Sequence, residues 1–234
     1  MFKIVSIIGC GLIGSSILRA IQNRNLAKEI RIFDLSKEVT AYLKKENISL
    51  NISTDIRNCI KDSDLIIIAT PLSSYKEIIL SIKDDLKEGT ILTDTGSVKK
   101  EVMKIIHNIN LKGVNWIPSH PIAGTEESGP KAGHADMFKN RWCIISPPKE
   151  ADAQSIKILK SLWENIGSKV KIMTPEEHDE ILSLTSHLPH AIAYNIVRTV
   201  INVEDKLKQE VIQYSAGGLR DFTRIAASNP LMWK

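Results

Sequence analysis

The sequence is poor in cysteine and has no cysteine pair at metal-ligand spacing. Its three cysteines, Cys10, Cys59 and Cys143, are an odd number and lie far apart. A disulfide framework needs paired cysteines, and a zinc site needs closely spaced ligands. We therefore expect reduced thiols in a cytoplasmic protein, and no metal site.

Long apolar runs are also missing. No stretch approaches the roughly 20 residues that a membrane-spanning helix requires, and the N-terminus enters a strand pattern directly, without the pattern of a signal peptide. The net charge is only +4 over 234 residues, and many lysines stand beside acidic residues on predicted helices. This charge pattern is typical of a solvated surface. We therefore expect neither a membrane nor a nucleic acid as a partner.

The clearest motif follows the first apolar strand. Gly9, Gly11 and Gly14 have the spacing G-x-G-x-x-G, and a helix is predicted from Leu12. The first glycine allows a tight turn, the second lets a pyrophosphate approach the backbone, and the third lets the helix pack close to the strand. A strand before this motif and a helix after it indicate a dinucleotide site. We expect Leu12 and Ile13, at the helix N-terminus, to face the phosphates.

An acid, Asp34, ends the next predicted strand, twenty residues after the last glycine of the motif. Its carboxylate is placed to accept hydrogen bonds from the ribose hydroxyls of NAD and to repel the 2′-phosphate of NADP. Arg31 and Lys37 lie nearby and soften this preference. A glycine-rich turn without a ligand is the plainer alternative, but it needs neither the second glycine nor the acid. We predict NAD as the cofactor.

Apolar strands alternate with helices through residues 1–173. This alternation predicts an α/β fold, a doubly wound Rossmann-type domain with a parallel sheet. From Pro175 onward no strand pattern remains, and residues 181–200 carry an apolar stripe at helical spacing, punctuated near Pro189. We predict an all-helical second domain over residues 174–234.

Three polar loops follow predicted strands, where an open α/β sheet binds its ligand. They contain Thr70 and Pro71, then Asp94, then Ser119. We expect the loops to converge on the reactive end of the cofactor, with Thr70 and Pro71 contacting it.

Within the third loop, His120 is the strongest candidate for a general base. It follows a predicted strand, precedes Pro121, and titrates near neutral pH. Ser97 in the second loop is expected to orient the imidazole or a substrate hydroxyl, and to cap a helix that starts at Val98. A structural histidine and a simple helix cap are the plainer alternatives. If His120 receives a proton, activity should fall below a pKa of about 6–7.

The helical region adds further candidates. His187 and His190 share one helix face without acidic or cysteine partners at ligand spacing, so we expect them to face the site and not to hold a metal. Gly217 precedes a predicted helix and offers backbone donors. Arg224 is suited to a two-pronged pairing with a carboxylate, and an ion pair with Asp221 is its alternative role.

The sequence closely resembles the prephenate dehydrogenase family, which includes arogenate and cyclohexadienyl dehydrogenases. The His-Pro-x-Ala-Gly and Asp-Phe-Thr-Arg stretches are far more specific than the glycine motif. The matching stretches span nearly the whole chain in the family's order: residues 9–16, 94–99, 120–126, 186–190 and 221–226.

The resemblance implies oxidative decarboxylation of prephenate to 4-hydroxyphenylpyruvate, a step toward tyrosine, or of arogenate to tyrosine. It implies that His120 and Ser97 contact the ring hydroxyl while hydride leaves for NAD⁺, and that Arg224 holds a substrate carboxylate. The family's pattern also implies further residues around the substrate: Thr125, Glu126, His190, Gly217 and Trp233.

Members of that family usually continue for some tens of residues past the stretch matching residues 229–233, whereas this sequence stops at Lys234. We therefore expect a partial helical domain, and a homodimer formed through its apolar face with weakened association.

Two other readings stay open from the sequence. A β-hydroxyacid-type dehydrogenase would need a catalytic lysine on the helix around residues 181–200, which contains none. A catalytically silent NAD-binding regulatory protein would have no need to keep Ser97, His120 and Arg224 together.

Overall fold

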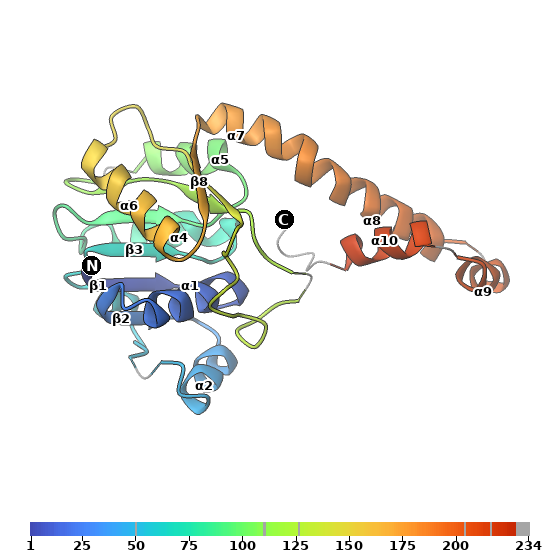
Figure 1. The fold of residues 1–234 in the computed structure, drawn as a ribbon, viewed down its shortest axis with the longest axis horizontal. Coiled ribbons are helices and arrows are strands. Elements are labelled where there is room, and N and C mark those ends of the chain that lie inside the picture. The colour runs from blue at the N-terminus through green and yellow to red at the C-terminus, as the bar shows by residue number, and fades with distance from the viewer. Residues whose placement is uncertain (50, 110, 126, 204, 216, 228–234) are drawn as a thin grey trace.

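The computed structural model describes most of the 234-residue chain. The described residues are 1–49, 51–109, 111–125, 127–203, 205–215 and 217–227. Figure 1 shows a body built on strands, from which a helical arm extends. We use "helical arm" for residues 183–227 and "sheet domain" for the strands with the helices that cover them.

Apolar strands form a parallel sheet in the order β2-β1-β3-β4-β5. The order reverses between β1 and β3, the crevice where folds of this kind bind dinucleotides. The strands are β1 (Phe2–Ile8), β2 (Ala27–Phe33), β3 (Leu65–Ile68), β4 (Ile91–Asp94) and β5 (Asn115–Trp116).

Helices cover both faces of this sheet. Along β3, Leu65 and Ile67 belong to one buried cluster, which includes side chains of α1 and α6. Ile66 and Ile68 belong to the opposite cluster, with side chains of α4 and α5. Burial on both faces explains why β3 has no polar residue. The helices are α1 (Leu12–Asn23), α2 (Lys37–Lys45), α3 (Ile56–Ile60), α4 (Tyr75–Ile82), preceded by the 3₁₀ turn η1 (Leu72–Ser74), α5 (Lys99–His107) and α6 (Ala153–Asn165).

A second, smaller sheet stands beside the first. It contains β6 (Ser119–Pro121), β7 (Trp142–Ile145) and β8 (Lys169–Ile172), with β6 antiparallel to β7 and β8 parallel to it. His120 lies within β6, opposite Ile144. His120, expected at a strand terminus, thus lies next to the end of a separate short strand that the sequence did not predict. A strand this short, ending in a proline, has too little periodicity to be read from sequence.

Beyond β8 the described part of the chain is helical, as predicted. α7 (Pro175–Leu182) leads into a π-helical turn, η2 (Ser183–His187), and then into α8 (Leu188–Ile201). Pro189 lies in the first turn of α8. Proline cannot donate a backbone hydrogen bond, and a wider π turn accommodates that loss. The predicted punctuation near Pro189 therefore takes the form of a π turn within one long helical run.

The helical arm has little core of its own. Beyond α7, Ala193 is the only buried apolar side chain within the described residues, whereas Leu184 and Leu188 are 64% and 50% exposed. α8 packs against α10 (Gly217–Ala226), and α9 (Asp205–Gln213) lies at the far end of the arm (Figure 1). No helix in the described part of the chain is both long and apolar enough to cross a bilayer.

The expected fold class, a Rossmann-type sheet followed by helices, is confirmed. The sequence analysis missed α3 and β6, which are both short. We keep the division into residues 1–173 and 174–234 as a proposal; it falls between the end of β8 and the start of α7.

Candidate active site

The glycine loop between β1 and α1 has the geometry that each glycine was expected to provide. Gly9 has φ of +87°, and a Cβ there would lie 2.6 Å from Cγ2 of Thr70. A Cβ on Gly14 would collide with the carbonyl oxygen of Gly9. Gly11, in contrast, has nothing within 4 Å of its would-be Cβ. The first and third glycines are required by packing, and the second leaves space for a ligand to approach.

The start of α1 is open to an anion. Gly11 is the N-cap residue and supplies no side-chain cap, so the N–H groups of Leu12 and Ile13 begin the helix without one. Uncapped N–H groups together with the helix dipole attract phosphate groups. Thr70 touches the same loop through Gly9, and its Oγ1 accepts a hydrogen bond of 2.8 Å from Ser74.

Asp34 ties this loop to the end of β2. Its Oδ2 accepts a 2.7 Å hydrogen bond from the backbone N–H of Cys10, and its Oδ1 accepts a 2.8 Å bond from that of Ser36. Each oxygen keeps a further lone pair for a ribose hydroxyl. Burial, with the charge of Asp34 adding to it, raises the pKa of the Cys10 thiol to about 12, so this thiol adds no charge to the loop.

A buried ion pair joins the end of β4 to the second sheet. Lys99 Nζ donates 2.7 Å hydrogen bonds to Asp94 Oδ2 and to the carbonyl of Ser119, and both charged side chains are fully buried. Asp94 also accepts from the N–H groups of Gly96 and Ser119. The second and third polar loops therefore converge, as expected. Lys99 itself was missed, because a lysine in a polar loop ordinarily indicates a solvated surface.

Ser97 lies at an exposed bend beside this cluster, and it does not cap the following helix. α5 starts at Lys99, with Val98 as its N-cap residue and no cap from its own chain segment. The carboxylate of Asp179, from α7, accepts the backbone N–H groups of Lys99 at 2.7 Å and of Lys100 at 2.9 Å. The predicted capping role of Ser97 is therefore wrong, because a carboxylate eighty residues away satisfies these donors.

His120 is partly buried and forms a chain of hydrogen bonds with α7. Its Nδ1 lies 2.8 Å from Nε2 of His178, and Nδ1 of His178 lies 2.7 Å from Oδ1 of Asp179. The two rings meet edge to face with centroids 5.1 Å apart. The sequence analysis gave no role to His178 or Asp179. Nothing local marks them, because they reach His120 only through the tertiary fold.

The environment of His120 disfavours its protonated form. Burial lowers its pKa well below the ordinary value, and the positive charge of Lys99 and the neighbouring His178 and His187 add to the effect. The expectation of a pKa near about 6–7 is therefore too high. The imidazole is neutral at physiological pH, as a general base must be before it takes a proton.

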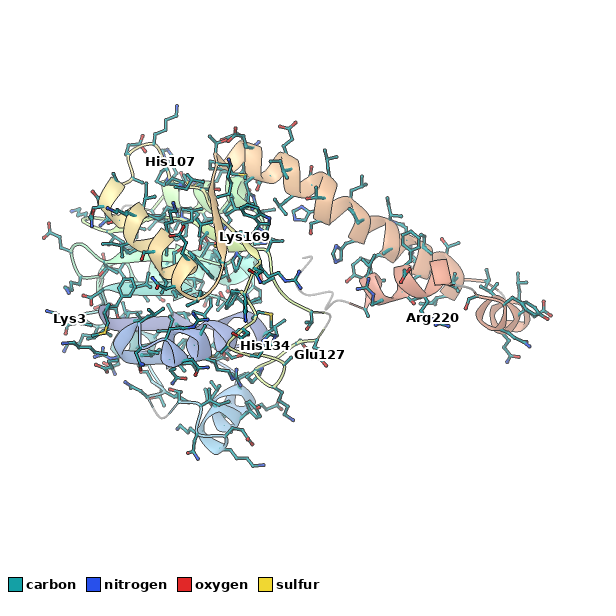
Figure 2. The ribbon with its side chains drawn as sticks, in the orientation of Figure 1. Lys3, His107, Glu127, His134, Lys169 and Arg220 are labelled. Carbon is teal, nitrogen blue, oxygen red and sulfur yellow. The ribbon has the colours of Figure 1, made fainter. Side chains whose placement is uncertain are left out.

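The segment after β6 runs back to the start of α1. A Cβ atom added to Gly124 would lie 3.9 Å from Cδ2 of Leu12. Arg19 on α1 donates a 3.0 Å hydrogen bond to the carbonyl of Pro130. Thr125 is exposed on this segment, while Glu126 lies outside the described residues. Figure 2 shows Glu127 on the side of the sheet domain toward the arm. The base and the glycine loop are thus joined by one stretch of chain.

The remaining predicted residues belong to the helical arm. His190 on α8 is partly buried, and its Nδ1 donates a 2.8 Å hydrogen bond to the carbonyl of Ser186. Gly217 opens α10 and is exposed, as is Arg224 further along that helix. Arg224 forms no ion pair with Asp221 in the described part of the chain. Figure 2 shows α10, through its labelled Arg220, on the arm and away from the strands.

The geometry thus groups the predicted site residues in two sets. The cofactor loop, Ser97 and His120 surround the carboxyl end of the sheet. His190, Gly217 and Arg224 lie on the arm, and Trp233 lies outside the described residues. No cluster of three or more histidine, cysteine, aspartate or glutamate side chains suited to a metal occurs within the described ranges.

Two family models match the chain. The nucleotide-binding domain of prephenate dehydrogenase matches residues 17–172, and the dimerization domain of prephenate dehydrogenase matches residues 174–234. The chain belongs to the prephenate dehydrogenase family.

The chain is also similar to individual members of the prephenate dehydrogenase family. The chain is 38% identical over 234 residues to a cyclohexadienyl dehydrogenase of Zymomonas mobilis, of which it covers 80%. It is 32% identical over 227 residues to a prephenate dehydrogenase of Bacillus subtilis, covering 97% of this chain and 61% of that protein. Its fold is similar to that of an Aquifex aeolicus prephenate dehydrogenase in complex with hydroxyphenyl propionate and NAD⁺, with a TM-score of 0.90 and 31% identity over 100% of this chain and 81% of that one.

The family expected from the sequence motifs is therefore confirmed. The roles of individual residues in this member of the prephenate dehydrogenase family rest on the geometry above.

Proposed function

We propose that this chain catalyses the NAD-dependent oxidative decarboxylation of prephenate to 4-hydroxyphenylpyruvate, a step in tyrosine biosynthesis. Arogenate, the amino-acid counterpart of prephenate, is the second candidate substrate, because related proteins carry the names cyclohexadienyl and arogenate/prephenate dehydrogenase. The observation that carries the proposal is a partly buried His120, whose surroundings disfavour its protonated form, on a strand that leads into a segment near the glycine loop. This placement matches a reaction in which a hydroxyl oxygen loses its proton and the carbon that bears it loses a hydride.

The residues of the sheet domain fit NAD. The open space at Gly11 and the uncapped N-terminus of α1 accommodate a pyrophosphate, which we place on Leu12 and Ile13. Asp34 is held by two backbone N–H groups at the position where a ribose diol would bind. We place Thr70 and Pro71 on the next part of the cofactor, at the end of β3. When bound, NAD⁺ supplies the acceptor for the hydride.

His120 receives the proton of the substrate's ring hydroxyl while the hydride leaves the carbon that bears this hydroxyl. Loss of carbon dioxide makes the ring aromatic, and the proton on His120 then returns to the phenol oxygen. The net reaction removes one hydride and releases one carbon dioxide. Ser97, exposed at the bend before α5, contacts the same hydroxyl. Because aromatisation supplies the driving force, the protein mainly aligns the reacting groups and starts the proton transfer.

The helical arm supplies the groups that hold the substrate's anionic part. We assign the carboxylate contact to Arg224, whose guanidinium matches a carboxylate with two parallel hydrogen bonds. His190 and the backbone of Gly217 line the same side. Thr125 and Glu126 follow β6, and Trp233 follows α10 in the sequence; we place them around the substrate as the family's pattern implies.

We also propose that two copies associate through the arm. Apolar side chains of η2 and α8 are exposed, so this surface of the arm is not covered by the described part of the chain. The family model for this region is that of a dimerization domain. Exposed apolar surface of this kind usually marks an interface. Light scattering over a range of concentrations measures the association. A monomer at high micromolar concentration would contradict it.

The activity is tested by following NADH formation with NAD⁺ and either prephenate or arogenate. We expect turnover of at least one of them, strongly reduced in His120→Asn but not in Glu180→Gln, which changes an exposed carboxylate of α7. A protein that binds NAD⁺ but oxidises neither compound would contradict the proposal and support the regulatory reading. Turnover of a β-hydroxy acid in their place would support that rival class.

A further inference from the structure

The Asp179–His178 pair of α7 is directed at the proposed base. We propose that His178, oriented by Asp179, holds His120 in the tautomer with its proton on Nδ1, so that Nε2 carries the lone pair that receives the substrate's proton. His178 and Asp179 are positioning residues, because they act through His120 and do not touch the substrate. This inference rests on the proposed function and deepens it, since it assigns an orientation to the base of the same site.

The hydrogen-bond geometry defines a single line of three groups. Oδ1 of Asp179 lies 2.7 Å from Nδ1 of His178, and Nε2 of His178 lies 2.8 Å from Nδ1 of His120. His178 is fully buried, and both of its ring nitrogens are used in this line. The one side-chain hydrogen bond of His120 within the described part of the chain uses Nδ1 and leaves Nε2 without a partner there. It is the free end of the line.

The donor and acceptor roles follow from the carboxylate end. An ionised carboxylate only accepts, so Nδ1 of His178 must donate to Asp179. A neutral imidazole has one donor and one acceptor nitrogen, so Nε2 of His178 must then accept. Nδ1 of His120 therefore donates, and Nε2 of His120 is left as an acceptor. Each assignment forces the next, as long as Asp179 is charged and both rings are neutral.

The charges around the line satisfy that condition. Burial opposes ionisation of Asp179, but the N–H groups of Lys99 and Lys100 and the bond from His178 together lower its pKa. Burial lowers the pKa of His178 despite the bond to Asp179, with the charge of Lys99 acting in the same direction. His120 is affected in the same way, as described above.

The groups that face the line come from several elements. Asp94 from β4 and Lys99 from α5 form their own buried pair, and His187 approaches from η2. Asp94 lies close enough to favour the charged form of His178, but burial outweighs it. Burial, with the charge of Lys99 acting in the same direction, therefore keeps the rings neutral, and Asp179 supplies the only carboxylate bonded to them in the described structure.

Asp179 has a second task that makes the arrangement rigid. Its two oxygens accept the N–H groups that open α5, directly after the bend that carries Ser97. Docking of α7 on α5 therefore orders both the helix start behind Ser97 and the tautomer of His120. The position of α7, the element that leads into the helical arm, determines whether the base is correctly protonated.

The tautomer can be measured without substrate or cofactor. A free neutral histidine prefers its proton on Nε2, so a His120 with its proton on Nδ1 is a distinct signature in nitrogen NMR spectra of the imidazole rings. We expect the Nδ1–H form at neutral pH in the wild type and in Glu180→Gln, the adjacent charge-removing control. We expect loss of that preference in His178→Phe, which keeps a ring of similar shape and removes both hydrogen bonds. A wild-type His120 with its proton on Nε2 would overturn the proposal.

Kinetics with the accepted substrate tests the consequence. We expect His178→Phe to lower kcat by about tenfold to a hundredfold, a large part of what a general base contributes, with KM changed by less than about threefold. His178→Gln can present an amide oxygen near the position of the lost Nε2, so it should restore part of kcat. Equal losses in the two variants, or wild-type kcat in His178→Phe, would contradict the acceptor role.

Asp179→Asn separates the hydrogen bond from the charge. Asparagine is a good helix cap, and its amide oxygen can still accept from His178 and the start of α5. We therefore expect the protein to fold and the tautomer to persist, with a smaller loss of kcat than in His178→Phe. If Asp179→Asn instead lowered kcat more than His178→Phe while folding normally, the charge of Asp179, and not the tautomer, would be the dominant effect and the proposal would fail.

The two proposals fail in distinguishable ways. If the wild type oxidises neither prephenate nor arogenate, the proposed function is wrong, while the NMR spectra still report the tautomer. If the wild type is active but His120 carries its proton on Nε2, the function stands and the positioning role is wrong. Thermal unfolding of each variant is the control for both tests, because a melting temperature close to that of the wild type shows that the fold is kept.

Discussion

The sheet domain and the helical arm hold their candidate site residues in opposite ways. In the sheet domain, Asp34 and Asp94 each accept more than one backbone N–H group, so the loops around them are fixed by the fold itself. On the arm, Gly217 and Arg224 are exposed, and Arg224 has no ion-pair partner in the described part of the chain. The candidate residues of the sheet domain are thus organised in advance, whereas these two candidates on the arm are exposed in the described structure.

The difference follows from where each region buries apolar surface. The sheet domain has an apolar cluster on each face of its sheet, and these clusters support the loops above them. The arm has no comparable cluster in the described ranges. We infer that the proposed cofactor half is supported by the fold of a single subunit, while the proposed substrate-holding half depends on association and on the ligand. α7 joins the two, because it packs on α5 and leads into α8.

We expect the largest effect from removal of the proposed base, His120, which belongs to the sheet domain. His120→Asn should lower kcat by about two to four orders of magnitude, because asparagine can form a hydrogen bond but cannot take the proton. KM should change little if the arm holds the substrate. Steady-state NADH formation measures both constants. A variant with wild-type kcat would exclude His120 from the chemistry. The contrast between the sheet domain and the arm would then have no bearing on catalysis.

The next effect tests whether the sheet domain is organised by its buried ion pair. Lys99→Ala leaves the fully buried carboxylate of Asp94 without its cation. Removal of one partner of a buried pair typically costs about 3–5 kcal/mol in the free energy of unfolding. Urea denaturation measures this loss, with Lys100→Ala, an exposed lysine next in the sequence, as the matched control. A loss as small as that of the control would show that the pair is not needed for stability.

Arg224→Ala addresses the arm. If Arg224 meets a substrate carboxylate only when the ligand is bound, its loss should raise KM far more than it lowers kcat. A hydrogen-bonded contact to a charged group contributes about 1.5–3 kcal/mol, which corresponds to at least a tenfold rise in KM. Arg224→Lys should restore part of the affinity, because lysine cannot form two parallel bonds. Arg220→Ala, on the same helix, is the control. An unchanged KM in Arg224→Ala would assign substrate holding to another group.

The parts of the molecule that sequence could predict are those set by local patterns. The glycine motif, Asp34 and the fully apolar β3 depend on neighbours in the chain, and the structure places each where its pattern indicated. The capping of α5 could not be predicted, because Asp179 approaches from eighty residues away. His178 lay outside the prediction for the same reason. A lone histidine in a helix has no sequence signal until the fold brings another ring beside it.

A smaller effect concerns cofactor choice. Asp34→Ser removes the carboxylate that would repel a 2′-phosphate, so the preference for NAD⁺ over NADP⁺, measured as a ratio of kcat/KM, should fall. Because Asp34 also holds the N–H groups of Cys10 and Ser36, some loss with both cofactors is expected. Asp34→Asn keeps an acceptor for these groups and separates loop support from charge. A wild type that already prefers NADP⁺ tenfold would contradict this role for Asp34.

The smallest effect is a displacement of the pH profile. Burial, Lys99 and the neighbouring histidines lower the pKa of His120 well below its ordinary value of about 6.5. The base becomes protonated only below that lowered pKa, so kcat/KM should stay level as the pH falls through about 6.5 and decline at lower pH.

The stability of the folded state should also decrease as the pH falls. A histidine with a lowered pKa in the folded state takes up a proton more readily on unfolding, so the folded state loses stability as the pH falls below about 6.5. Melting temperatures over the same pH range therefore separate protonation of the base from unfolding. A decline of kcat/KM that begins at or above about 6.5, with the protein still folded, would show that the surroundings of His120 do not lower its pKa.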